Sequence, residues 1–319
     1  MLSETSEIKY GKGYVELEYV KDTIALPNST LKVTDAQFGV ATSSSELNEG
    51  ILGLGFGKGY NLNYSNLIDE LYDQKVTKTR AFSVALGSVD ENNGGTLIFG
   101  GVDTKKFTGK LVSNPILGPQ NRENLYRYWI EMSSITLVQG SSSNSYSGTN
   151  LPVVLDSGSS LSYLPASVVR SMASDLNADL DQSGLYLVDC SLVDSDGTVD
   201  FAFGDVTIKV PFQEFIWQFD SRTCILGAVP VDSSSGITAL LGDTFMRSAF
   251  VVFDQTEKTI SMAQYVNCGE SEQAIPEGGA SFTGECEASA LKKNAAGRTS
   301  YSSAALAGGL FVGLAMCFM

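Results

Sequence analysis

Hydrophobic and polar positions alternate along short stretches of the chain, between clusters of Gly, Asn, Asp and Ser. Runs rich in Val, Ile, Phe, Tyr and Thr lie at 14–26, 31–42, 81–87, 95–101, 126–138, 205–212 and 249–264. Runs of this kind, bounded by turn-forming residues, predict strands and hairpins. Amphipathic helical spacing is convincing only at 64–75 and 165–180. The pattern predicts a mostly β protein with a few short helices and a polar surface loop at 140–150.

Size and charge narrow the choice of class and partner. With 319 residues and 43% hydrophobic content, the chain is long enough for two domains of roughly 100 to 200 residues. It carries 36 acidic against 21 basic residues, a balance that repels phosphate backbones and anionic lipid headgroups. Nucleic acid is therefore not an expected partner, and the glycine-rich stretch at 53–61 fits no phosphate-binding pattern.

The chain contains no histidine. This removes Ser-His and Cys-His nucleophilic catalysis as well as the commonest metal ligand. No C-x-x-C spacing is present either, so a zinc or redox site has no support. We expect neither a metal nor a cofactor, and chemistry that depends on carboxylates and hydroxyls.

Cysteine spacing favours structural disulfides. The five cysteines are Cys190, Cys224, Cys268, Cys286 and Cys317. If Cys317 lies in a removed tail, four remain and three pairings are possible. Sequence proximity favours Cys190 with Cys224 and Cys268 with Cys286. Buried free thiols in a cytosolic protein are the alternative.

The C-terminal sequence has the layout of a glycosylphosphatidylinositol (GPI) attachment signal. Small residues from Asn294 precede a polar spacer and a hydrophobic run at 304–319, a run short for a membrane span, although a plain tail anchor is the alternative. Residues 269–290 lack apolar periodicity and are expected to form a flexible stalk. Glycosylation sequons at Asn28 and Asn63 agree with export. The start, MLSETSEIKYGKG, has no signal-peptide pattern, so we expect either that the true N-terminus lies upstream of Met1 or that the chain is a degenerate relic.

The stretch LPVVLDSGSSLSYLP at 151–165 places Asp156 between an apolar strand and small hydroxyl residues. Peptide hydrolysis without histidine or metal needs two carboxylates that hold a water, one as base and the other as acid. A strand end holds such an aspartate rigidly, and a following glycine lets backbone amides approach its carboxylate. Asp156, Ser157, Gly158 and Ser159 provide these parts for one carboxylate.

The same residues resemble the second catalytic motif of the pepsin family of aspartic proteases. The segment EGILGLGF at 49–56 resembles that family's first-lobe crossing, and ALLGDTFMRSAFVVFDQ at 239–255 resembles its closing segment, where a hydrophobic pair and Gly242 cross beneath the active-site loop. The resemblance implies that Asp156 is a catalytic carboxylate and Ser159 its hydrogen-bonding support. It further implies that Tyr10 and Gly11 belong to the flap over the substrate.

One part of the family pattern is absent from the sequence. A first Asp-[Thr/Ser]-Gly motif should precede the flap, yet only nine residues precede Tyr10, and every Asp-Thr pair is followed by a residue other than Gly. The flap also departs from the pattern at Lys12 and Tyr14. We therefore expect a bilobal, pepsin-like fold with an incomplete N-terminal lobe, exposed apolar strand faces and little or no proteolysis by the chain as written.

The resemblance implies an aspartic endopeptidase of the cell-surface fungal kind, similar to yapsins and candidapepsins, acting on peptide or protein substrates as a monomer. A non-catalytic, surface-anchored peptide-binding protein is the alternative, and a dimer pairing two Asp156 loops is a third hypothesis. Membrane contact is expected only through a lipid anchor. The expected segments are a first-lobe remnant at 1–124, a C-terminal lobe at 125–266, a stalk at 267–303 and a hydrophobic tail at 304–319.

Overall fold

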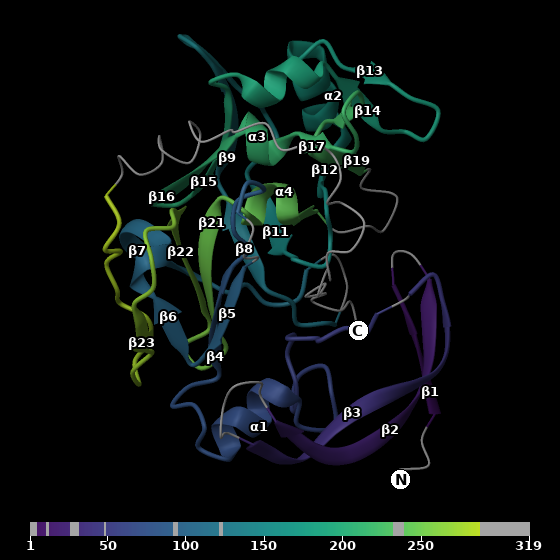
Figure 1. Ribbon diagram of the computed structural model, residues 1–319, viewed down its shortest axis with the longest axis vertical. Helices are drawn as coiled ribbons and strands as arrows, with labels where there is room; N and C mark the ends of the chain where they lie inside the picture. Colours follow the sequence, from purple (N-terminus) through teal and green to yellow (C-terminus); the bar gives the residue numbers. More distant parts are fainter. Residues whose placement is uncertain are drawn as a thin grey trace.

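The computed structural model (Figure 1) is built mainly of β-strands arranged in several sheets. It describes residues 5–10, 13–25, 32–47, 49–91, 95–120, 124–231 and 239–287. Gly11, Asn28, Asn294 and the hydrophobic tail lie outside these residues. The predictions made for those four features are therefore untested by the fold.

A five-stranded antiparallel sheet in the order β5-β4-β21-β22-β7 forms the centre of the molecule. Its strands are β4 (Ala81–Ala85), β5 (Thr96–Phe99), β7 (Phe107–Pro115), β21 (Ala249–Asp254) and β22 (Thr259–Tyr265). Every residue of β4 and β21 is buried, as expected for strands covered on both faces. Because β4, β5 and β7 come from the first part of the chain and β21 and β22 from its later part, the sheet joins the two.

Three sheets build the part of the molecule that we call the second lobe, within residues 125–246. One sheet has the order β19-β12-β20-β11-β8, from β8 (Trp129–Met132), β11 (Leu151–Leu155), β12 (Ser162–Pro165), β19 (Ala228–Val231) and β20 (Leu240–Leu241). The next has the order β10-β9-β15-β16, from β9 (Ser134–Gln139), β10 (Ser142–Ser145), β15 (Thr198–Phe203) and β16 (Val206–Pro211). The third has the order β13-β14-β18-β17, from β13 (Asp179–Leu180), β14 (Tyr186–Val188), β17 (Trp217–Gln218) and β18 (Cys224–Ile225).

The helices are short. They are α1 (Leu67–Asp73), α2 (Ala166–Asp175), α3 (Phe212–Phe215) and α4 (Asp243–Met246), with 3-10 turns η1 (Thr104–Lys106) and η2 (Cys190–Asp194). The first two lie within the ranges 64–75 and 165–180 that the sequence pattern predicts. Helix α1 begins at a capping box, in which the Asn66 side chain accepts from the Asp69 amide and Asp69 accepts from the Asn66 amide. Helix α2 buries Val168, Val169 and Met172 against the main core.

A three-stranded antiparallel sheet, β1-β2-β3, lies beside α1 at the opposite end of the molecule from α2 (Figure 1). Its strands are β1 (Thr5–Lys9), β2 (Tyr14–Ala25) and β3 (Lys32–Ser45). A cavity of about 490 Å³ lies between this sheet and the segment around residues 50–56, with Val15, Leu17 and Phe56 in its wall. The wall is therefore largely apolar.

Both disulfides predicted from proximity are formed. Cys190 is bonded to Cys224 and Cys268 to Cys286, with Cα atoms 5.2 and 5.8 Å apart. The first joins η2 to β18 in the second lobe. The second closes a loop of the C-terminal segment and ties its end back to the last residues after β22.

The expectation of a flexible stalk is wrong for residues 268–287. This C-terminal strap contains β23 (Glu272–Ala274), which pairs with β6 (Gly101–Asp103) at the edge of the molecule (Figure 1). Ile275 is 0% exposed and packs in a cluster with Val102 and Phe107. The amides of Gly284 and Glu285 donate to the carbonyls of Gly109 and Thr104. Backbone pairing and the buried Ile275 side chain hold the strap in place. Neither requires the apolar periodicity whose absence suggested a stalk.

The polar segment at 140–150 is also more regular than predicted. Ser142–Ser145 form β10, an exposed edge strand that pairs with β9. The sequence pattern predicted only a loop here because no apolar face is buried. Backbone pairing in a hairpin with Gly140 (φ 56°) at its turn forms the strand without one.

Candidate active site

Asp156 follows directly after the buried end of β11. Leu155 is 0% and Asp156 2% exposed. Strand β11 pairs in parallel with β20 on one side and antiparallel with β8 on the other. The Asp156 amide donates to the Leu241 carbonyl at 3.0 Å, so the aspartate backbone is held by the neighbouring parallel strand.

The turn after Asp156 directs both of its carboxylate oxygens. The Gly158 amide donates to Oδ1 at 3.0 Å, and the Ser159 hydroxyl donates to Oδ2 at 2.7 Å. Ser157 is 7% exposed and lies at the corner of this turn. Hydrogen bonds from a backbone amide and a hydroxyl to a carboxylate are charge-assisted, and together they fix the plane of the carboxyl group. This is the arrangement expected of Ser159 and Gly158 from the sequence motif.

The segment Leu241 to Thr244 crosses beneath this turn. The Asp243 amide donates to the Ser159 carbonyl at 2.8 Å, and the Thr244 amide donates to the Ser160 carbonyl at 3.2 Å. A Cβ atom on Gly242 would lie 2.3 Å from the Ser159 carbonyl oxygen. The close approach therefore requires glycine at this position.

Hydroxyl groups fix the crossing from the other side. The Ser162 hydroxyl accepts from the Gly242 amide at 3.2 Å and lies 3.2 Å from the Thr244 hydroxyl, which donates to the Gly227 carbonyl at 2.7 Å. Ser162 is 0% and Thr244 5% exposed. All of these groups are satisfied without water, so the floor beneath Asp156 is rigid.

Asp243 is a second carboxyl group at this site that the sequence analysis did not single out. Burial raises its pKa to about 7, the nearby Arg247 guanidinium opposes this shift, and the charge of Asp156 adds to it. Its Oδ1 atom is buried and makes no hydrogen bond within the described part of the chain. The sequence does show an acidic residue directly after Gly242. That this residue lies near Asp156 follows only from the tertiary structure.

The predicted flap residue lies in a different part of the structure. The Tyr10 amide donates to the Gly13 carbonyl at 3.1 Å across the turn between β1 and β2. Tyr10 lines the cavity beneath the three-stranded sheet, and Asp156 is not among the residues of that wall. The flap role of Tyr10 and Gly11 remains a prediction.

The predicted glycosylation residue Asn63 is exposed, in the loop that precedes α1. Within the described ranges, no group of three His, Cys, Asp or Glu side chains is arranged to hold a metal ion. None of the described helices has the length and the apolar composition needed to cross a membrane.

An aspartate at the end of a buried strand, held by its own D-S-G turn above a glycine crossing, has the local geometry expected from the resemblance to pepsin-like aspartic proteases. The fold agrees with this class. The crystal structure of the aspartic proteinase from Irpex lacteus matches 82% of this chain and 82% of its own, with a TM-score of 0.69 and 22% sequence identity. The bilobal, mostly β fold predicted from the sequence is thereby confirmed.

A family model described as eukaryotic aspartyl protease matches residues 1–265, and the chain belongs to this family. The probable aspartic-type endopeptidase opsB of Aspergillus oryzae is 37% identical over 265 residues, which cover 77% of this chain and 52% of the relative. Secreted aspartic protease 9 of Candida albicans is 33% identical over 78% of this chain and 48% of its own. Aspartic proteinase 3 of Saccharomyces cerevisiae is 33% identical over 81% and 47%. The chain thus spans about half the length of these curated relatives.

Proposed function

We propose that this chain forms part of an aspartic endopeptidase in which Asp156 is one of two catalytic carboxylates. The second carboxylate comes from polypeptide outside the 319 residues. In this mechanism one carboxylate removes a proton from a bound water as the water attacks the peptide carbonyl, and the other donates a proton to the carbonyl oxygen. The bonds from Gly158 and Ser159 to Asp156 keep its carboxyl plane fixed toward that water.

The observation that carries the proposal is a repeated crossing. Residues 240–242 read Leu-Leu-Gly and residues 51–53 read Ile-Leu-Gly. In the second lobe this segment accepts the Asp156 amide at Leu241 and pairs in parallel with β11. Among the described residues, the peptide groups of residues 51–53 make no hydrogen bond, and this segment lines the cavity of about 490 Å³. We call residues 51–55 the first-lobe crossing segment.

A strand ending in a second aspartate would fill this place. It would pair with the first-lobe crossing segment as β11 pairs with β20, and its apolar side chains would occupy the cavity beside Val15 and Leu17. Unpaired backbone groups and an apolar wall both favour such an occupant. The half-length match to the curated relatives supports a source in a longer polypeptide.

The substrate class that fits the family is an extended peptide or a protein segment, with Tyr10 and Gly11 closing over it. Two relatives are named as secreted aspartic protease and as aspartic-type endopeptidase, and two disulfides agree with an oxidising compartment. We therefore propose an extracellular location, with GPI attachment at Asn294 and glycans on Asn28 and Asn63. The enzyme would act as a monomer, since two lobes already complete one site.

The test is a chimaera. The segment of the Aspergillus oryzae relative that precedes the aligned region is joined before Met1, and peptide hydrolysis is measured at acidic pH. The chimaera should be active, whereas Asp156→Asn in it should lose at least roughly 10²-fold of the rate, the usual minimum for a general acid or base. The 319-residue chain alone should show little or no hydrolysis.

The controls separate loss of catalysis from loss of fold. The asparagine variant should keep the same sedimentation mass and thermal transition as the active chimaera. A folded chimaera that binds extended peptides but does not hydrolyse them would overturn the proposal and favour a peptide-binding surface protein. Activity that sediments with a dimer of the chain alone would instead favour two Asp156 loops facing each other.

A further inference from the structure

Tyr128 contacts both the Asp156 strand and the first-lobe crossing segment. Its backbone carbonyl accepts from the Leu155 amide at 3.4 Å, directly before Asp156. Its side-chain hydroxyl donates to the Leu54 carbonyl at 2.7 Å. One residue thereby connects the two segments that, under the proposed function, carry the two catalytic carboxylates.

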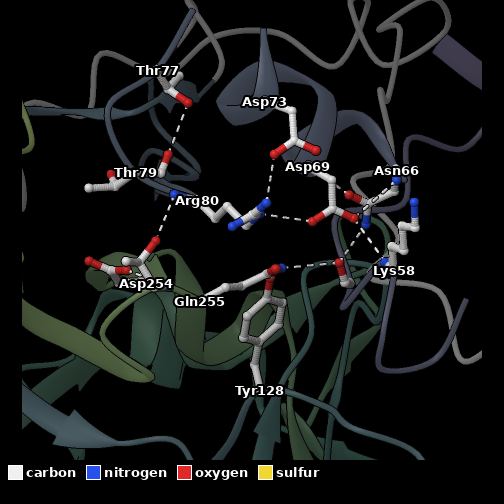
Figure 2. Close-up of polar contacts among 12 residues, drawn as sticks. Lys58, Asn66, Asp69, Asp73, Thr77, Thr79, Arg80, Tyr128, Asp254 and Gln255 are labelled. Atoms are coloured by element: carbon white, nitrogen blue, oxygen red, sulfur yellow. Dashed lines mark hydrogen bonds and ion pairs between the residues drawn. The ribbon is translucent and has the colours of Figure 1, made fainter. Parts of the chain in front are cut away.

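Gln255 fixes the direction of the tyrosine hydroxyl. Its Nε2 atom donates to the Tyr128 hydroxyl at 2.7 Å (Figure 2), so the single hydroxyl proton is left for the Leu54 carbonyl. The same Nε2 lies 3.2 Å from the Gly55 carbonyl. Burial raises the pKa of Tyr128 far above its usual value, which keeps the hydroxyl protonated, and therefore a donor, at acidic and neutral pH.

The ring of Tyr128 cannot move away from this position without repacking aromatic neighbours. Tyr128 is 2% exposed, and its ring centroid lies 5.0 Å from that of Phe56 and 4.7 Å from that of Phe253. Phe56 directly follows the first-lobe crossing segment, and Phe253 lies on strand β21 of the central sheet, so the two neighbouring rings come from distant parts of the chain. The contact is therefore rigid on both the polar and the apolar side.

A buried carboxylate secures the far side of the first-lobe crossing segment. The Asn66 side chain donates to the Gly55 carbonyl at 2.8 Å. Asp69, the partner of Asn66 in the helix cap, accepts from the Lys58 amide at 2.9 Å and from Arg80 Nε at 3.1 Å (Figure 2). The carbonyls of Leu54 and Gly55 are thus held from two directions, whereas the peptide groups of residues 51–53 have no hydrogen-bond partner among the residues that the structure describes.

We propose that Tyr128, oriented by Gln255, is a positioning residue that sets the spacing between Asp156 and the carboxylate carried by the opposite lobe. The inference rests on the proposed function for its catalytic consequence. The mechanical coupling between the Asp156 strand and the first-lobe crossing segment rests on the contacts alone. The two parts are therefore tested separately.

The coupling is tested by amide hydrogen exchange in the 319-residue chain. Tyr128→Phe removes only the hydroxyl and leaves the buried Leu54 carbonyl without its donor, so the bonded amides on the two sides of the contact, those of Lys58 and Leu155, should exchange roughly tenfold faster, the effect of one hydrogen bond. Gln255→Leu should act in the same direction with a smaller effect. Tyr146→Phe is the matched control, because its hydroxyl donates to Asp175 at 2.8 Å within the second lobe. Equal acceleration at all amides in Tyr128→Phe, or none at Lys58 and Leu155, would overturn the inference.

The catalytic consequence is tested in the active chimaera. Tyr128→Phe should lower kcat by roughly 10- to 100-fold, the usual cost of a small misplacement of reacting groups, with little change in KM. The acidic and basic limbs of the profile of kcat against pH should also move closer together. Two carboxylates that lie further apart repel each other less, so their apparent pKa values differ less.

The two readouts separate the two proposals. A purely structural role for Tyr128 would lower the thermal transition and leave the pH profile in place, and that result would overturn the positioning role. Tyr146→Phe should change neither kcat nor the limbs. A chimaera inactive with Tyr128 intact would overturn the proposed function, and the exchange experiment would still decide the coupling.

Discussion

At the scale of single residues, Asp243 links the site to the stability of the chain. Burial raises the pKa of its carboxyl group from 3.8 to about 7. The folded chain then holds this proton more tightly than the unfolded chain. Its contribution to stability is fully present below pH 3.8 and is lost as the pH rises to about 7. Since one pKa unit corresponds to about 1.4 kcal/mol, the contribution is at most roughly 4 kcal/mol.

We therefore predict that Asp243→Asn flattens the pH dependence of stability between pH 4 and 7. Urea unfolding midpoints at several pH values measure this directly. The exposed Glu131, on β8, provides the control, because Glu131→Gln should give a curve parallel to that of the unsubstituted chain. Parallel curves for Asp243→Asn as well would show that its carboxyl group is not held in the protonated form.

Gly242 gives a second prediction at the residue scale. A Cβ atom there would lie 2.3 Å from the Ser159 carbonyl oxygen and 2.6 Å from that of Leu161, and backbone atoms cannot turn aside as a side chain can. Gly242→Ala should therefore lower the free energy of unfolding by roughly 1–3 kcal/mol. Gly118→Ala, where a Cβ would meet open space, is the matched control. Equal unfolding midpoints for the two variants would contradict the close crossing.

The residues that the sequence could reveal are those with local signals. Asp156, Gly158 and Ser159 form one continuous turn, so the motif predicts their mutual hydrogen bonds. Tyr128 and Gln255 are 127 positions apart, and although Gln255 ends the closing segment at 239–255, nothing in that segment indicates a contact with Tyr128. Their contact follows from the packing of the central sheet against the second lobe, which a single sequence does not disclose.

At the scale of elements, the C-terminal strap makes a prediction that separates it from a stalk. Ile275 is 0% exposed, and its amide donates to the Gly100 carbonyl at 2.8 Å. Ile275→Ala should lower the free energy of unfolding by roughly 2–5 kcal/mol through the cavity it leaves. Glu277→Ala, two residues further and exposed, should change it by less than about 0.5 kcal/mol. Thermal unfolding of the two variants measures the difference, and equal effects would indicate an unattached segment.

Elements with a strong apolar period were predictable, and elements that depend on backbone pairing were not. The run at 249–264 is rich in Val, Ile and Phe on either side of a polar turn and so predicts the hairpin of β21 and β22, and the spacing at 165–180 predicts α2. Strands β10 and β23 are exposed along their whole length. Because they bury no side chains of their own, only their pairing partners define them.

At the scale of the whole molecule, the sequence predicts two lobes but not the contacts that hold them together. The tip of the hairpin between β4 and β5 is bound by the second lobe. Glu214, on α3, accepts from the Ser88 hydroxyl and from the Val89 amide at 3.2 Å, while Arg247 donates to the Gly87 carbonyl at 3.2 Å. Glu214 is 8% exposed. A buried carboxylate thus joins the central sheet to the second lobe, across 126 positions of sequence.

Glu214→Ala should loosen this junction. The substitution removes the acceptor of the Ser88 hydroxyl and of the Val89 amide; because Ser88 is half-buried and Val89 is exposed, water can replace the carboxylate in part, and each lost bond should cost about 0.5–1.5 kcal/mol. We expect a lower unfolding midpoint together with faster exchange of the Val89 amide. Gln213→Ala is the control, because Gln213 is adjacent and, among the described residues, its side chain bonds to the exposed Asp90 alone. If the Val89 amide exchanges equally in both variants, the lobes are held by their apolar contacts and by Arg247, and the carboxylate adds nothing to the junction.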